Sequence, residues 1–239
     1  MQRTDEMTKP SSVTSISIGV GIATGLYGIS FGALSVTAGL DVWQTQVLSL
    51  LMFSGGSQFA FIGVIAAAGG AGVASAGIGA AIVSAWLLGV RNGFYAVRLG
   101  PILNMVGLKK LIPALLTIDE STAVATSQEE PKNQVKGFWL TGLAVFFFWN
   151  LMTLVGALLG NALGDPSRWG LDAAAAASFL GLLWPRLMER QALAVGAVAL
   201  VIATAATPFV PAGYPVLLAA VAAIVVGIFN WFSPKTGEK

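Results

Sequence analysis

The chain has 239 residues, of which 56% are hydrophobic and only 10% are charged. Soluble domains average about 25% charged residues, so this composition indicates an integral membrane protein. The net charge of +2 is a small surplus of basic residues and gives no indication of nucleic-acid binding. The absence of histidine and cysteine excludes His–Cys zinc sites, Ser-His-Asp triads, thiol nucleophiles and disulfides, so we expect no enzyme, no metal site and no cofactor.

Long runs without a charged residue predict the membrane-spanning helices, because a span needs about 20 apolar residues. The alternating pattern of an outer-membrane barrel is absent. The sequence therefore predicts an all-α polytopic membrane protein with seven, or alternatively eight, transmembrane helices, some of them interrupted. Residues 1–15 are expected to form a flexible tail, residues 16–232 a single transmembrane domain, and residues 233–239 a C-terminal tail. The uncharged runs comprise residues 10–40, 42–90, 137–164, 173–185 and 191–234.

The second and last of these runs are each long enough for two spans, or for one span and a broken one. A short span is expected from Ala173 to Met188. The stretch 91–136 decides the topology, because it carries many of the basic residues. If it stays on the cytoplasmic side, seven helices cross, which the positive-inside rule favours. If a helix over residues 98–128 crosses with buried charges, there are eight.

A short motif recurs in the two halves of the chain. Gly39-Leu40-Asp41 returns as Gly170-Leu171-Asp172, and each aspartate is suited to cap the start of a helix. Each motif is followed by an apolar stretch and then by a helix breaker, which in the second half is Pro185-Arg186. Interrupted helices at corresponding positions are typical of transporters with an inverted repeat. Three matching residues can also recur by chance, so an internal repeat and chance remain alternatives.

The segment Ser54-Gly55-Gly56-Ser57-Gln58 is the first of these breakers and the strongest candidate site. Each glycine destabilises a helix by roughly 1 kcal/mol relative to alanine. An unwound turn inside the bilayer leaves backbone N–H groups free to bind an anionic group at a half-helix N-terminus. We therefore predict a cradle for a carboxylate, to which Ser57 and Gln58 add side-chain hydrogen bonds. Close helix packing and a plain turn between helices are the alternatives.

Two polar groups further along the chain are also candidates. Arg91 and Asn92 follow an apolar stretch, and the guanidinium either binds a carboxylate or marks the membrane surface at a helix end. Asp119 and Glu120 either cap a surface helix or lie at membrane depth, where a carboxyl group readily takes up a proton. Since there is no histidine, these two are the best candidates for proton coupling.

Stripes of small residues predict close contacts between helices. They are Gly21-x-x-x-Gly25, Gly28-x-x-x-Gly32 and Gly156-x-x-x-Gly160-x-x-x-Gly164.

Several of these motifs together resemble the AzlC (azaleucine-resistance) family of branched-chain amino acid exporters. The resemblance covers about residues 16–232. One departure is that Asn92 stands where the family has a histidine after the motif arginine, so a role for that imidazole is absent or has moved. The matching segments are Gly28-Ile29-Ser30-Phe31-Gly32, Ala38-Gly39-Leu40, residues 49–59, Val90-Arg91-Asn92 and Thr117-Ile118-Asp119-Glu120.

The resemblance implies a multi-pass protein of the bacterial inner membrane that exports leucine, isoleucine, valine and sometimes methionine. It also implies a small AzlD-type membrane subunit as partner and an ion gradient as the driving force. We expect Phe31 and Phe59 to hold the aliphatic side chain of the substrate. The chain has no G-x-x-x-x-G-K-[ST] loop for ATP and no potassium-filter sequence. The alternative is a non-transporting structural or assembly subunit of a membrane complex.

Overall fold

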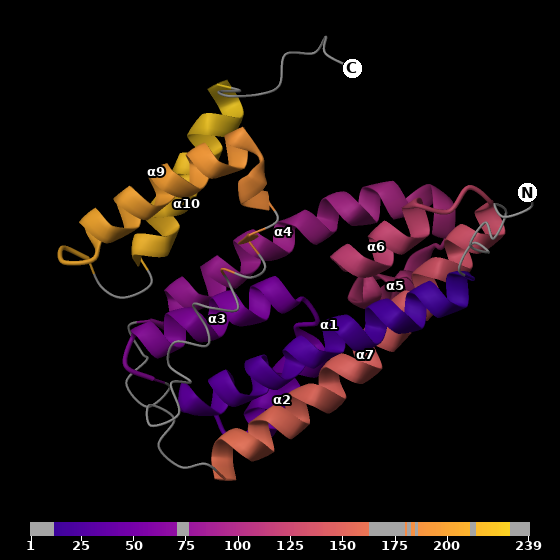
Figure 1. Ribbon diagram of the computed structural model, residues 1–239, viewed down its shortest axis with the longest axis horizontal. Helices are drawn as coiled ribbons and strands as arrows, with labels where there is room; N and C mark the ends of the chain where they lie inside the picture. The colour runs from indigo at the N-terminus through magenta and orange to yellow at the C-terminus, as the bar shows by residue number, and fades with distance from the viewer. Residues whose placement is uncertain are drawn as a thin grey trace, which may run out of the picture.

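The computed structural model describes residues 12–70, 77–162, 180, 183–184, 186–210 and 214–229. These residues form helices joined by turns, with no strand among them, as the predicted all-α class requires (Figure 1). In chain order the elements are α1 (Val13–Thr37), α2 (Val42–Leu51), α3 (Gly55–Ala67), α4 (Ile78–Leu103), η2 (Gly107–Lys110), α5 (Leu111–Leu116), α6 (Asp119–Thr126), α7 (Pro131–Ala162), η4 (Arg186–Met188), α9 (Arg190–Ala206) and α10 (Tyr214–Phe229).

Three helices are long and apolar enough to cross a membrane, namely α1, α4 and α7. They contain 25, 26 and 32 residues. At about 1.5 Å per residue each exceeds the hydrocarbon thickness of about 30 Å. The helices α3, α9 and α10 are apolar but shorter. The total of seven or eight spans therefore stays a prediction.

The glycine stripes bring α1 and α7 into direct backbone contact, as predicted. A Cβ atom at Gly21 would lie 2.6 Å from the Cβ of Ala144, and one at Gly25 would lie 2.5 Å from the Cβ of Phe148. Contacts advance in the same direction along both helices, so α1 and α7 run parallel. A buried hydrogen bond of 2.9 Å, donated by Thr141 to the Ser17 hydroxyl, joins the same pair. Gly164 lies outside the described residues.

The chain does break in this region, but at residues 52–54 and not over the predicted residues 54–58, because residues 55–58 already form the first turn of α3. The break forms the tip of a hairpin. Asp41 caps α2 by accepting a 2.7 Å hydrogen bond from the backbone N–H of Gln44. The helix ends at Leu51, and α3 begins at Gly55 after three residues without helical structure. Beyond the end of α3, Gly70 approaches Ala38 at the end of α1. The hairpin of α2 and α3 therefore starts beside the end of α1, turns inside the bundle, and comes back to the same end of α1.

A second broken pair, α5 and α6, follows α4. Its tip is stabilised by Ser121, whose hydroxyl accepts a 3.1 Å bond from the Ile118 amide and donates one of 2.6 Å to the Leu116 carbonyl. The alternative prediction of one helix over residues 98–128 is wrong. The chain leaves the helix at Asn104, which has a left-handed backbone with φ of 44°, and it breaks again before α6.

The helix α4 does not end with the uncharged run 42–90, since it continues through Arg91 and Arg98 to Leu103. Two broken pairs thus alternate along the chain with three long helices, and α4 packs mainly against α3 of the first pair (Figure 1). The helices α9 and α10 pack against each other, and α10 also contacts α4. The recurrence at Gly170-Leu171-Asp172, Pro185 and most of the predicted span from Ala173 lie outside the described residues, so the internal repeat stays a prediction.

Candidate functional site

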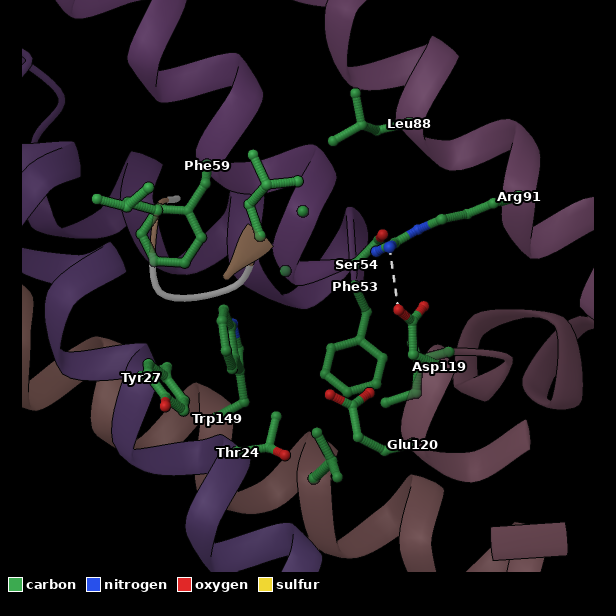
Figure 2. A pocket seen from close by; sticks show the side chains of 16 residues that line it. Thr24, Tyr27, Phe53, Ser54, Phe59, Leu88, Arg91, Asp119, Glu120 and Trp149 are labelled. Atoms are coloured by element: carbon green, nitrogen blue, oxygen red, sulfur yellow. Dashed lines mark hydrogen bonds and ion pairs between the residues drawn. The ribbon is translucent and has the colours of Figure 1, made fainter. Parts of the chain in front are cut away.

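A cavity of about 650 Å³ lies where the three long helices meet the tips of both broken pairs (Figure 2). It is polar on the side of α4 and α6 and mainly aromatic and aliphatic elsewhere. The residues that line it are Thr24, Tyr27, Phe53, Ser54, Gly55, Gly56, Phe59, Leu88, Arg91, Ile118, Asp119, Glu120, Val145, Trp149, Leu180 and Leu183.

The cavity is located at half the length of the bundle. Thr24 is near the centre of α1, Arg91 is near the centre of α4, and Val145 is near the centre of α7. With a rise of about 1.5 Å per residue, each lies roughly 15–25 Å from the ends of its helix. Binding sites of secondary transporters occupy this depth, at the ends of discontinuous helices.

An ion pair crosses the polar side of the cavity. The Arg91 Nη1 atom lies 2.9 Å from the Asp119 Oδ2 atom, and each side chain is 36% exposed. Figure 2 shows the two side chains meeting from α4 and α6. Arg91 therefore does not mark a helix end at the membrane surface. It presents a partly accessible cation to the interior of the bundle.

The N-terminus of α3 adds a second positive feature beside this pair. Ser54 is the N-cap residue, but its side chain accepts no hydrogen bond from the first turn. In the part of the chain that the structure describes, the amides of Gly55, Gly56 and Ser57 have no acceptor. A Cβ atom at Gly56 would lie only 2.9 Å from the Arg91 guanidinium. Guanidinium and helix end together favour a bound anion.

Glu120 lies next to the ion pair but takes no part in it. Its side chain lines the cavity between Asp119 of the same helix and Thr24 of α1 (Figure 2). Among the described residues it makes no salt bridge. The two adjacent carboxylates thus differ in environment, since one is paired with a cation and the other is not.

The apolar wall is held in place by a buried amide. Gln58 donates from Nε2 to the carbonyl oxygens of Met52 at 2.8 Å and Ser49 at 3.3 Å, and its Oε1 accepts a 2.8 Å bond from the Trp149 indole. Trp149 then forms an edge contact with Phe59, with ring centroids 6.3 Å apart. Gln58 therefore fixes the helix break and an aromatic wall at once.

Comparison with known proteins identifies the family of the chain. Residues 19–163 match the family model described as AzlC protein, which is more than half of the chain. The chain belongs to the AzlC family. This family is linked to branched-chain amino acid transport and is a transporter-type family. No curated protein and no solved structure matches the chain.

The region that matches AzlC contains most of the cavity, including seven of the residues singled out in the sequence. The structure brings together Ser54, Gly55, Gly56, Phe59, Arg91, Asp119 and Glu120. Phe31, Ser57, Gln58 and Asn92 do not line the cavity.

Each of these four residues has a different location. Phe31 is fully buried and packs behind Phe59. The Ser57 hydroxyl faces Gly89 of α4. Gln58 uses its amide within the protein, and Asn92 has a buried side-chain oxygen away from the cavity.

Among the cavity residues of this AzlC-family chain that the sequence did not single out, three carry polar atoms. Thr24, Tyr27 and Trp149 lie on long apolar helices, where helical spacing alone does not separate a cavity face from a lipid face. The polar atoms of Thr24 and Trp149 were a usable signal, because such groups in a span need a partner. Within the described residues, no cluster of acidic side chains could hold a metal ion.

Proposed function

We propose that this protein is the large subunit of a secondary transporter that exports branched-chain amino acids across the bacterial inner membrane. The observation that carries the proposal is the mid-depth cavity, which combines a charged side with an apolar side. Its volume of about 650 Å³ lies within the range of about 300–1,000 Å³ that is usual for small-ligand sites. Leucine, isoleucine, valine and methionine share a zwitterionic head and an apolar side chain, as such a cavity requires.

The expected binding mode follows from the positions of the polar groups. The substrate carboxylate accepts hydrogen bonds from the amides of Gly55 and Gly56 and from Arg91, while the ammonium group faces Asp119. The aliphatic side chain then lies against Phe59 and Trp149. Phe31, first expected to touch the substrate, instead supports these rings from behind.

The small AzlD-type partner belongs to the proposal because of the family resemblance. The direct test expresses both subunits in bacteria that are fed leucine- or valine-containing dipeptides. We expect intracellular leucine or valine to fall and the extracellular amino acid to rise, compared with cells that lack the pair. Unchanged export with both subunits present in the membrane would refute the proposal. A ligand-induced thermal shift in the partner alone would favour the assembly-subunit alternative.

We further propose that export is coupled to protons and that Glu120 carries the proton. A carboxyl group without a cationic partner can be neutralised in a low dielectric without breaking an ion pair, whereas Asp119 is held by Arg91. Glu120→Gln should therefore abolish leucine transport driven by a pH gradient but retain leucine–leucine exchange in proteoliposomes. Glu129→Gln, at an exposed position outside the cavity, is the matched control. Normal gradient-driven transport by Glu120→Gln would exclude this role.

A further inference from the structure

Two opposite charges in the cavity pair with each other. Arg91 and Asp119 come from different helices and meet at 2.9 Å. Among the described residues, the Ser54 hydroxyl has no hydrogen-bond partner, although Ser54 is only 7% exposed, and the Nε atom of Arg91 is likewise buried without a partner. Ser54 and Arg91 line the cavity together with Gly55 and Gly56 at the α3 N-terminus.

The Asp119 carboxylate occupies the position that an incoming carboxylate would take on Arg91. A partly buried charge that loses its partner without a replacement is destabilised, because the cavity solvates it less well than bulk water does. A ligand with only a carboxylate could pair with Arg91 but would leave Asp119 unpaired. A ligand with only an amine could pair with Asp119 but would leave Arg91 unpaired. A zwitterion replaces both interactions at once.

We propose, building on the function proposed above, that the substrate splits the Arg91–Asp119 ion pair and that this exchange restricts the site to zwitterions. Arg91 then pairs with the substrate carboxylate, supported by Ser54 and the α3 amides, and Asp119 pairs with the ammonium group. The pair thus acts as a specificity determinant. Breaking this ion pair also removes the link between α4 and α6. Only a substrate with both a carboxylate and an ammonium group therefore frees the second broken pair, α5 and α6.

The experiment measures binding to the purified wild-type chain in detergent, through ligand-induced changes in thermal stability. The probes are L-leucine, 4-methylpentanoate, which lacks the ammonium group, and methylamine, which supplies only that group. We expect leucine to bind and each of the other two to bind weakly alone. Together they should bind cooperatively, because each pairs with the charge that the other leaves unpaired. Methylamine should then improve the apparent affinity for 4-methylpentanoate by about fivefold or more, and 4-methylpentanoate should improve that for methylamine by the same factor.

Variants test the two charges separately. Asp119→Asn leaves Arg91 without its carboxylate, so this variant should bind 4-methylpentanoate about tenfold or more tighter than the wild type and leucine correspondingly more weakly, reversing the preference. Arg91→Gln should instead favour 3-methylbutylamine, which keeps the leucine side chain without the carboxylate. Glu129→Gln removes an exposed carboxylate and should behave as the wild type.

The outcomes separate this inference from the proposed function. If the wild type binds no branched-chain amino acid, the proposed substrate class fails. If it binds leucine but shows no cooperativity between methylamine and 4-methylpentanoate, the ion-pair exchange is refuted and the substrate class stands. The cooperativity measurement needs no variant, so it remains decisive if Asp119→Asn does not fold. A folded Asp119→Asn that still prefers leucine would overturn the inference as well.

Discussion

Replacing Gly32 by valine is expected to prevent α1 from packing on α7 and to leave little folded protein. A Cβ atom at this position would overlap the carbonyl oxygen of Thr153 and would lie 2.7 Å from the backbone nitrogen of Ala157. Both atoms are backbone of a 32-residue helix and cannot rotate away. Overpacking costs about 1–3 kcal/mol where side chains can adjust, so a cost of about 3 kcal/mol or more is expected here.

The measurement is the yield of monodisperse protein in detergent, followed by its melting temperature. Gly19→Val on the same helix is the matched control, because a Cβ atom at Gly19 meets nothing within 4 Å. The control should purify and melt like the wild type. A Gly32→Val protein with wild-type yield and melting temperature would show that the two helices do not pack as closely as described.

Replacing Gly56 by leucine is expected to abolish export while leaving the chain inserted in the membrane. The new side chain would push against the Arg91 guanidinium, 2.9 Å from the position of its Cβ, and against the Leu88 side chain at 3.4 Å. These neighbours are side chains that can yield, so the fold should survive. The carboxylate-binding side would be blocked, and losing charged hydrogen bonds worth about 2 kcal/mol weakens binding roughly 30-fold.

Export from dipeptide-fed cells and the amount of protein in the membrane fraction are measured together for this variant. Gly79→Leu serves as the control, since a Cβ atom at Gly79, at the start of α4, meets no neighbour. Unaltered export by Gly56→Leu would eliminate the α3 N-terminus as a binding element. Loss of the protein from the membrane would instead assign Gly56 to folding.

Sequence reasoning located the helix break and the glycine stripes because each depends on local residue chemistry. Glycines weaken a helix and so indicate a nearby break, although Gly55 and Gly56 themselves begin α3, and small residues in a span favour contact whatever the partner. The same reasoning left open whether Arg91 marks a helix end or binds a carboxylate, because a single charge after an apolar stretch is compatible with both. Burial beside Asp119 and the α3 N-terminus lets α4 continue through it, and that compensation involves residues distant in the chain.

The roles of neighbouring polar residues depended even more on the tertiary structure. Gln58 and Ser54 belong to one motif, yet Gln58 holds Trp149 while Ser54 faces the cavity. Asp119 and Glu120 are adjacent carboxylates, yet only Asp119 meets a guanidinium in the described part of the chain. By itself the sequence determined the helical membrane class, the first break and the closely packed helix faces, since these follow from hydropathy, glycine and side-chain size. Only the packing of α1, α4 and α7 around two hairpin tips decided which polar groups share a cavity, because opposite charges far apart in sequence are brought together by helix contacts alone.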